Sequence, residues 1–317
     1  MSKCIVTGAT GFIGRALCEE LLAQGDEVYA LIRPQSAKRQ ILDSLAVNER
    51  LHIVEAPLEA LADSLAGVGI SADVFFHLAW HGSAGAARED FSMQARNISY
   101  MEQALLGAKV CGCSKFVGAG SQAEYGVVQE RAYEGQTLAR PFMMYGAAKH
   151  AAYQMGRLLA RQLGIAFVWP RIYSVYGVGE NPGTLVNYVL DSLAEKQVPE
   201  LSPCENMWNF LYITDCAKIL AALGKVQAAE GIYHVASDDT RPLKDFVSEI
   251  RDRVAPGAEL GFGMREASPE RTFWLEPDTT KLKEIVRLEY VPFATGIDKK
   301  IKLMGGVNSD EYARKGL

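Results

Sequence analysis

The sequence has no long uninterrupted hydrophobic run, although 49% of its 317 residues are hydrophobic. A membrane-spanning helix needs ~20 consecutive apolar residues, and no stretch approaches that length. The first apolar run, Cys4 to Thr7, is short and leads directly into glycines, unlike the longer core of a secretory signal segment. We therefore expect a soluble, cytoplasmic protein with no membrane partner.

An excess of positive charge is also missing. The chain has 33 Lys and Arg against 38 Asp and Glu, which gives a net charge of −5, and the basic residues are scattered along it. Binding to nucleic acid depends on a concentrated basic surface. Nucleic acid is therefore not an expected partner.

Cysteine and histidine are scarce, with six and five residues respectively. Cys111 and Cys113 form the only close cysteine pair, and neither a second pair nor a histidine cluster is available to complete a zinc site. We expect reduced thiols and no metal centre. Internal repeats and low-complexity segments are also absent.

The first half of the chain alternates short apolar runs with helical patterns. The runs lie at 3–7, 27–33, 51–56, 73–79, 115–120 and 165–171. Apolar strands separated by helices indicate an α/β fold, with a parallel sheet covered on both faces. After Gly177, prolines are frequent and the stretches look irregular, apart from a helix near 184–196 and a strand at 231–237. We expect a dinucleotide-binding domain over 1–176, with a returning strand near 209–237, and a smaller, mainly substrate-binding lobe over 177–317.

The turn after the first predicted strand reads TGATGFIG, in which two residues separate Gly8 from Gly11 and two separate Gly11 from Gly14. Glycines there permit a tight turn, let the backbone approach a pyrophosphate and allow close packing of helix on strand. The helix that follows would direct N–H groups and its positive dipole end at the phosphates. This pattern predicts a dinucleotide site in a Rossmann-type doubly wound sheet.

The second strand ends in ALIRPQSAKR, which has no acidic residue to hold the ribose 2′-hydroxyl of NAD. It offers Arg33, Ser36 and Lys38 instead, and an arginine suits a 2′-phosphate. We predict a preference for NADP(H), with NAD(H) still possible.

Tyr145 and Lys149 stand four residues apart in MMYGAAKHAAY. Positions i and i+4 share one face of a helix, so the ammonium would lie near the phenol. A neighbouring cation favours phenolate and lowers the pKa of a tyrosine towards the range where it can exchange protons.

Together these motifs resemble the extended short-chain dehydrogenase/reductases, the group of nucleotide-sugar epimerases, dehydratases and 4-ketoreductases. The resemblance covers roughly residues 3 to 285. Its other markers are FHLAW, FVGAGSQAEYG, PRIYSVYG and NFLYITDCAK, in that order along the chain. It implies that Tyr145 donates or accepts the proton, that Lys149 supports it and binds the nicotinamide ribose, and that Ser121 completes a catalytic triad.

The resemblance also implies binding residues. Those expected at the cofactor, besides the triad residues Tyr145 and Lys149, are Gly8, Thr10, Gly11, Phe12, Ile13, Gly14, Arg33, Ser36, Lys38, Leu58, Leu78, Ala79, Trp80, Asn97 and Ile172. Those expected at the substrate are His81, Ser121, Gln122, Glu124, Ser174, Asn187 and Arg271. Glu124 is an unusual neighbour of the triad serine, and a second acid or a sugar ligand is weighed there against a structural role. His77 is expected to pack or to pin a loop.

Three positions depart from the family pattern. Pro57 stands where many members have an aspartate against adenine, Trp208 stands where many have an arginine, and Ser174 ends a motif that usually ends in asparagine. The family's substrate contacts therefore do not transfer directly.

The function predicted from these residues is NADPH-dependent reduction of a 4-keto-6-deoxy nucleotide sugar. The alternatives are an NAD-dependent nucleotide-sugar 4-epimerase, an NADPH-dependent reductase of aldehydes or ketones, and a non-catalytic dinucleotide sensor. An intact triad argues against the sensor. The expected partners are a nucleotide-diphosphate sugar and, as the family suggests, a second copy of the chain bound through the helices around 97–110 and 145–163.

Overall fold

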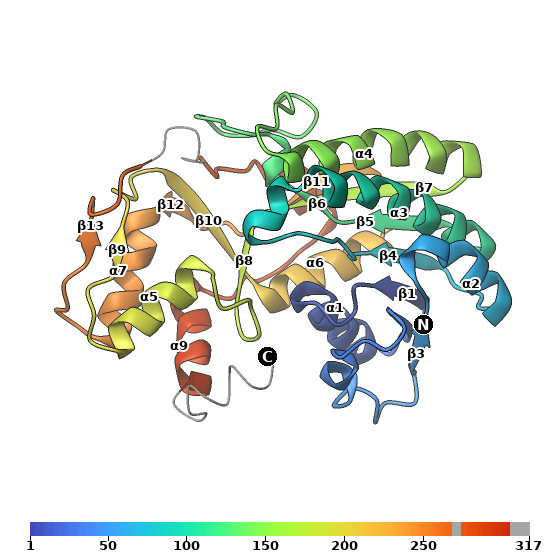
Figure 1. Ribbon diagram of the computed structural model, residues 1–317, viewed down its shortest axis with the longest axis horizontal. Helices are drawn as coiled ribbons and strands as arrows, with labels where there is room; N and C mark the ends of the chain where they lie inside the picture. Colours follow the sequence, from blue (N-terminus) through green and yellow to red (C-terminus); the bar gives the residue numbers. More distant parts are fainter. Residues whose placement is uncertain (268–273, 305–317) are drawn as a thin grey trace.

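A computed structural model describes residues 1–267 and 274–304 of the chain. Its central feature is a parallel sheet with the strand order β11-β7-β5-β4-β1-β2-β3, and β6 adds to β7 (Figure 1). The strands are β1 Lys3–Thr7, β2 Glu27–Ile32, β3 Leu51–Glu55, β4 Val74–His77, β5 Lys115–Gly118, β6 Gly120–Ser121, β7 Ala166–Ile172 and β11 Gly231–Val235. The order reverses between β1 and β4, so the prediction of a Rossmann-type doubly wound α/β sheet is confirmed.

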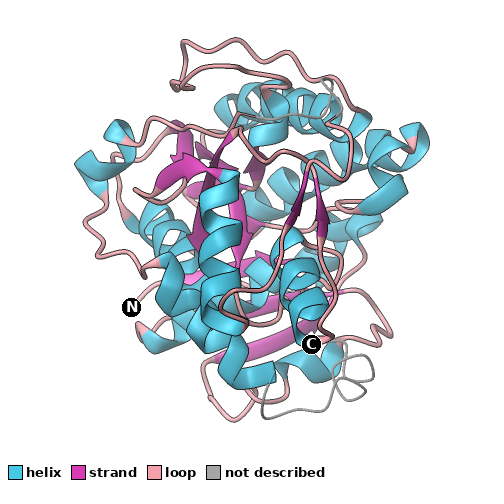
Figure 2. Ribbon diagram, turned by 90° about the vertical axis from the view of Figure 1, so that its left-hand side faces the viewer, coloured by secondary structure: helices cyan, strands magenta, loops and turns pink. Residues whose placement is uncertain are grey.

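Helices cover both faces of this sheet (Figures 1 and 2). The helices α1 Phe12–Ala23 and α6 Ile213–Lys225 share one hydrophobic core with it. The helices α2 Leu61–Val68, α3 Phe91–Val110 and α4 Met144–Leu163 share the other. Strands such as β4 and β5 are buried at every position, which explains why they read as continuous apolar runs.

A smaller lobe lies on the left in Figure 1. Its strands β8 Ser174–Tyr176, β10 Met207–Tyr212 and β12 Thr240–Pro242 form a second sheet, and β9 Glu200–Leu201 pairs with β13 Gly261–Phe262. The helices α5 Leu185–Ala194, α7 Leu243–Val254 and α9 Phe293–Met304 belong to this lobe, and residues of all three share one core with β10. The short helix α8 is Thr280–Ile285, and the 3₁₀ turns are η1 Arg39–Leu42, η2 Leu58–Ala60, η3 Gly85–Glu89 and η4 Gln122–Glu124.

The expectation of mostly irregular chain after Gly177 is wrong, because α6, α7 and α9 all lie there. Two of the prolines in this half are Pro242 and Pro292. Each stands immediately before a helix, α7 and α9 respectively. Proline is well tolerated at a helix start, because the first N–H groups have no partner within the helix.

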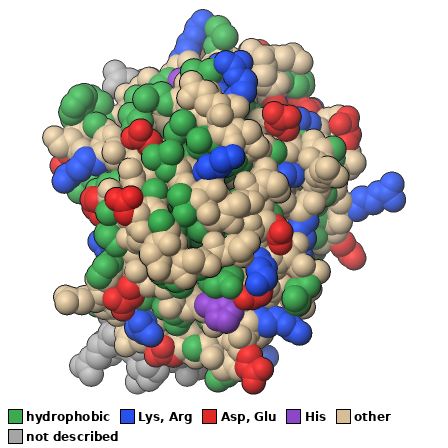
Figure 3. All heavy atoms as spheres, turned by 90° about the vertical axis from the view of Figure 1, so that its right-hand side faces the viewer, with side chains coloured by type: hydrophobic (Ala, Val, Ile, Leu, Met, Phe, Trp, Pro, Cys, Tyr) green, Lys and Arg blue, Asp and Glu red, His purple; other side chains and the backbone are tan. Residues whose placement is uncertain are grey.

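The face in Figure 3 shows basic, acidic and hydrophobic side chains interspersed. Within residues 1–267 and 274–304, no helix combines the length and the apolar character required to cross a bilayer. All six cysteines are buried as free thiols.

Candidate active site

The turn between β1 and α1 is built around its glycines. Gly8 has a φ of +71°, and a Cβ there would lie 2.7 Å from the Ala79 nitrogen. A Cβ on Gly14 would lie 2.1 Å from the Gly8 carbonyl oxygen. Gly11 is the N-cap of α1 and makes no side-chain cap hydrogen bond. This close turn, with glycine at three positions and a helix start behind it, fits the pyrophosphate of a dinucleotide.

The turn lies at the point where the strand order reverses, beside the carboxyl end of β4. Leu78 and Ala79 follow that strand, and the Ala79 nitrogen donates to the Thr7 hydroxyl at 3.3 Å. His77 is buried, and its Nδ1 lies 2.9 Å from the same hydroxyl. Burial lowers the pKa of His77 to about 3, so the ring stays neutral and links β4 to β1.

The structure brings Ser121, Tyr145 and Lys149 together. Ser121 ends β6, and its hydroxyl lies beside the phenol of Tyr145 in the first turn of α4 and lowers the pKa of that phenol. One turn further along, the Lys149 ammonium donates to the Ala119 carbonyl at 2.7 Å and lies 3.6 Å from the centre of the Trp80 ring. The phenol and the ammonium share one face of the helix, as the four-residue spacing predicts.

The cation nearest to the Tyr145 ring is not Lys149, as the four-residue spacing predicts, but Arg88. Burial raises the pKa of Tyr145, and the Ser121 hydroxyl and the Arg88 charge oppose that rise. Arg88 Cζ lies 4.5 Å from the centre of the Tyr145 ring, whereas Lys149 Nζ lies 5.7 Å away. Burial also lowers the pKa of Lys149 to about 7, although Glu124 opposes this. Arg88 is therefore the closer cation, because the buried Lys149 ammonium turns to a carbonyl and an indole face.

Nothing in the local sequence marks Arg88, which stands in η3 within the segment between β4 and α3. Two buried amides of α3 hold this segment. Gln94 Nε2 donates to the carbonyls of Gly82 at 2.7 Å and Ala87 at 2.9 Å. Asn97 accepts from the His81 nitrogen at 2.8 Å and donates to the His81 carbonyl at 3.0 Å. Asn97, predicted at the cofactor, thus uses its amide to hold a loop.

Glu124, predicted at the substrate, is fully buried behind Ser121 instead. Its Oε1 accepts from the Ser121 nitrogen at 2.9 Å and from the Trp169 indole at 2.8 Å. Its Oε2 accepts from Arg171 Nε at 3.0 Å and from Nη2 at 2.9 Å. Protein groups occupy both oxygens, so the geometry gives Glu124 a structural role rather than a substrate contact. It forms a capping box with Ser121 at the start of η4.

The family model for the NAD dependent epimerase/dehydratase family matches residues 4–236. That range contains the glycine turn and all three catalytic candidates. The chain belongs to this family. It is accordingly an NAD(P)-dependent enzyme on an extended short-chain dehydrogenase/reductase fold.

Within the family, the chain is 28% identical over 300 residues to a protein of Bacillus subtilis (strain 168) named uncharacterized UDP-glucose epimerase YtcB, covering 90% of this chain and 92% of that protein. It is 25% identical to CDP-abequose synthase of Yersinia pseudotuberculosis, covering 79% of this chain and 85% of that one. The structure of the UDP-glucuronic acid 4-epimerase of Bacillus cereus, in complex with UDP-glucuronic acid and NAD, superposes with a TM-score of 0.80 at 22% identity. The superposition covers 96% of this chain and 100% of the chain of that epimerase.

The remaining predicted residues are distributed around this family site. Thr10, Phe12 and Ile13 belong to the turn and the first turn of α1, Leu58 is buried after β3, and Ile172 ends β7. Arg33 and Lys38 are exposed after β2, and Ser36 there accepts from the Lys38 nitrogen at 3.3 Å. Gln122 begins η4 beside Ser121, and Ser174 begins β8. The Asn187 amide donates to the Asn181 carbonyl at 2.9 Å and accepts from Lys300 at 2.7 Å. Arg271 lies outside the described residues.

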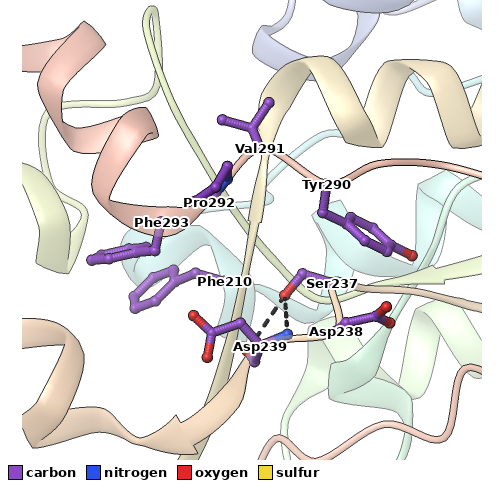
Figure 4. A pocket seen from close by; sticks show the side chains of 8 residues that line it. All are labelled: Phe210, Ser237, Asp238, Asp239, Tyr290, Val291, Pro292 and Phe293. Atoms are coloured by element: carbon purple, nitrogen blue, oxygen red, sulfur yellow. Dashed lines mark hydrogen bonds between the residues drawn. The ribbon is translucent and has the colours of Figure 1, made fainter.

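A separate hollow of about 310 Å³ lies in the smaller lobe, between β10 and the chain that leads into α9 (Figure 4). Asp238 and Asp239 line it, but each is already ion-paired, with Lys283 at 2.9 Å and Arg241 at 3.2 Å respectively. The hollow shares no lining residue with the catalytic group.

Proposed function

We propose that the protein is a nucleotide-sugar 4-epimerase. The observation that carries the proposal is the placement of Ser121 beside the Tyr145 phenol, with Lys149 one turn away, at the same edge of the sheet as a glycine turn that fits a dinucleotide. The name of the 28% identical relative, a UDP-glucose epimerase, supports the reaction class.

The residues divide the chemistry among them. Tyr145 takes the proton of the sugar hydroxyl as that carbon is oxidised and returns a proton when the keto group is reduced. Ser121 hydrogen-bonds the same oxygen and so stabilises the charge that develops there. A dinucleotide held by Gly8, Gly11 and Gly14 would supply the acceptor and donor of the hydride. The nucleotide diphosphate is assigned to the smaller lobe, where Ser174 and Asn187 stand.

A second candidate, NADPH-dependent reduction of a 4-keto nucleotide sugar, is favoured by one observation. The tip after β2 is exposed and basic at Arg33 and Lys38, and residues 33–40 include no carboxylate. A reductase must exchange its cofactor in every cycle, whereas an epimerase returns the hydride to the same sugar.

One experiment separates the two. The protein is incubated with a panel of UDP-, CDP- and dTDP-linked hexoses, and products are followed by chromatography together with the redox state of the cofactor. We expect two 4-epimers to approach equilibrium with no net change in cofactor. Stoichiometric oxidation of NADPH by a 4-keto sugar, without epimerisation, would replace the first proposal by the second. Inactivity on every sugar would remove both.

The cofactor preference is a separate proposal, since the same tip suits a 2′-phosphate. We expect Arg33→Asp to weaken NADP⁺ binding on the order of 10–100-fold and NAD⁺ binding far less, because it replaces a charge-assisted hydrogen bond with repulsion. Isothermal titration calorimetry measures both affinities. Arg50→Asp, the same change at an exposed site before β3, is the control. Equal affinity of the unmodified protein for the two cofactors would contradict the preference.

We also propose a homodimer through α3 and α4. Met144, Met155 and Leu158 lie on one side of α4 and are 43%, 59% and 42% exposed, and such an apolar stripe is typical of a contact surface. Met155→Glu with Leu158→Glu should convert a dimer to a monomer in light scattering, because two carboxylates per chain would have to be buried. Lys244→Gln, at an exposed position on α7 outside both helices, should leave the mass unchanged. A monomeric unmodified protein would refute the proposal.

A further inference from the structure

Arg88 stands on a segment that is fixed at both of its flanks. The carbonyl of Ala87 accepts from the buried Gln94 amide at 2.9 Å. On the other side, Glu89 Oε2 accepts from the Met144 nitrogen at 3.2 Å, which ties η3 to the first residue of α4. The guanidinium is thus carried by backbone that is anchored to the helix of the catalytic tyrosine.

This guanidinium lies over the Tyr145 ring, with Cζ 4.5 Å from the ring centre. Its Nε is buried and has no hydrogen-bond partner among the described residues. The other cation on that side, Lys149, is farther from the ring and donates to the Ala119 carbonyl. An arginine remains charged throughout the pH range of enzymes, whereas Lys149, with a pKa of about 7, loses its charge within that range.

We propose that Arg88 is a positioning residue of the catalytic site, which keeps a permanent positive charge against Tyr145 and so stabilises the phenolate that accepts the substrate proton. The proposal rests on the proposed function only in taking Tyr145 as the proton-exchanging group. In the oxidising direction the sugar O–H bond breaks, its proton forms the Tyr145 O–H bond, and the freed electron pair on oxygen forms the C=O bond. A bound dinucleotide would accept the hydride that leaves the same carbon.

The charged and polar groups around the phenol come from four elements. The Ser121 hydroxyl of β6 favours its ionisation, Glu124 of η4 opposes it, Lys149 of α4 lies behind the ring, and Arg88 of η3 lies over the ring. Arg171 already pairs with Glu124, so that carboxylate is largely compensated. Among these groups, Arg88 is the charge that acts directly in favour of the phenolate.

The test is a spectroscopic titration of Tyr145 that needs no substrate. The ultraviolet titration of Tyr145→Phe is subtracted from that of the unmodified protein, and the Arg88→Gln protein is treated in the same way. We expect Arg88→Gln to move the Tyr145 titration upward by about one pH unit or more, since a nearby opposite charge shifts a pKa by that amount. Arg88→Lys should recover part of the shift. Arg161→Gln, about 24 Å along α4 at 1.5 Å per residue, should cause none.

The pH dependence of the oxidation rate gives a second test, and the direction of its change can be predicted. A higher pKa for Tyr145 means that less phenolate is present at neutral pH, so Arg88→Gln should lose most oxidation rate there and recover as the pH rises. A merely structural defect would lower the rate equally at every pH. Arg88→Met, which keeps the aliphatic stem, replaces Arg88→Gln if that variant is unfolded by circular dichroism. An unchanged Tyr145 titration in a folded neutral variant would overturn the role of Arg88. Inactivity of the unmodified protein on all nucleotide sugars would overturn only the proposed function.

Discussion

Replacing Tyr145 with phenylalanine should reduce turnover by at least ~100-fold, because a positioned proton-transfer group contributes roughly 10²–10⁴-fold. The substitution removes one oxygen atom and keeps the ring against which Trp80 and Arg88 pack. Binding of the dinucleotide at the glycine turn should therefore change little. Steady-state rates and cofactor affinity, measured on the same preparations, separate the two effects.

Tyr153→Phe is the matched control, since Tyr153 stands two turns further along α4 and packs against Phe167 and Trp169. It should retain nearly full turnover. If Tyr145→Phe also retained it, the proton would have to come from elsewhere, and the assignment of the Ser121, Tyr145 and Lys149 group would fail.

The parallel sheet could be predicted because its signals are local. Each buried strand reads as its own apolar run, and TGATGFIG contains the whole turn within eight residues. In the smaller lobe only α5 gave such a signal, as the helix predicted near 184–196. Its helix α7 begins after Pro242, and α9 begins after Pro292. These segments are helical because their apolar faces meet in a core shared with β10, and a single segment does not reveal that partner.

The residues of the proposed catalytic group also differ in how far the sequence predicts them. Tyr145 and Lys149 could be paired from the sequence because one helical turn joins them. Arg88 could not, because only the packing of η3 on α4 brings it to the Tyr145 ring. Glu124 is an unusual neighbour of Ser121, but its partner Arg171 lies on β7, so SQAEYG alone does not reveal the ion pair.

The buried ion pair of Glu124 and Arg171 is expected to have a large effect on the stability of the fold. Glu124→Gln should lower the free energy of unfolding by about 3–5 kcal/mol, the usual cost of leaving one member of a buried ion pair uncompensated. The carboxylate accepts four hydrogen bonds from Ser121, Trp169 and Arg171. A glutamine amide would turn its NH₂ group towards one set of donors, so no rotamer restores all four. Urea denaturation followed by circular dichroism measures the loss, and Glu102→Gln on the exposed side of α3 should stay within about 0.5 kcal/mol of the unmodified protein.

Two further measurements identify the pair as the cause. Burial raises the pKa of Glu124, but the nearby His150 ring, Arg171 and the hydrogen bonds from Ser121 and Trp169 outweigh it and hold that pKa below its usual value. A carboxyl group with a lowered folded-state pKa contributes stability above its unfolded pKa, and this contribution is lost as the pH falls through the folded value. The unmodified protein should therefore lose stability on acidification more steeply than Glu124→Gln.

In a double-mutant cycle, Glu124→Gln combined with Arg171→Met should lower the free energy of unfolding by less than the sum of the two single changes, since neither charge is then left without its partner. Strict additivity would mean that the two groups act independently, and the role of Arg171 as the counterion would have to be given up.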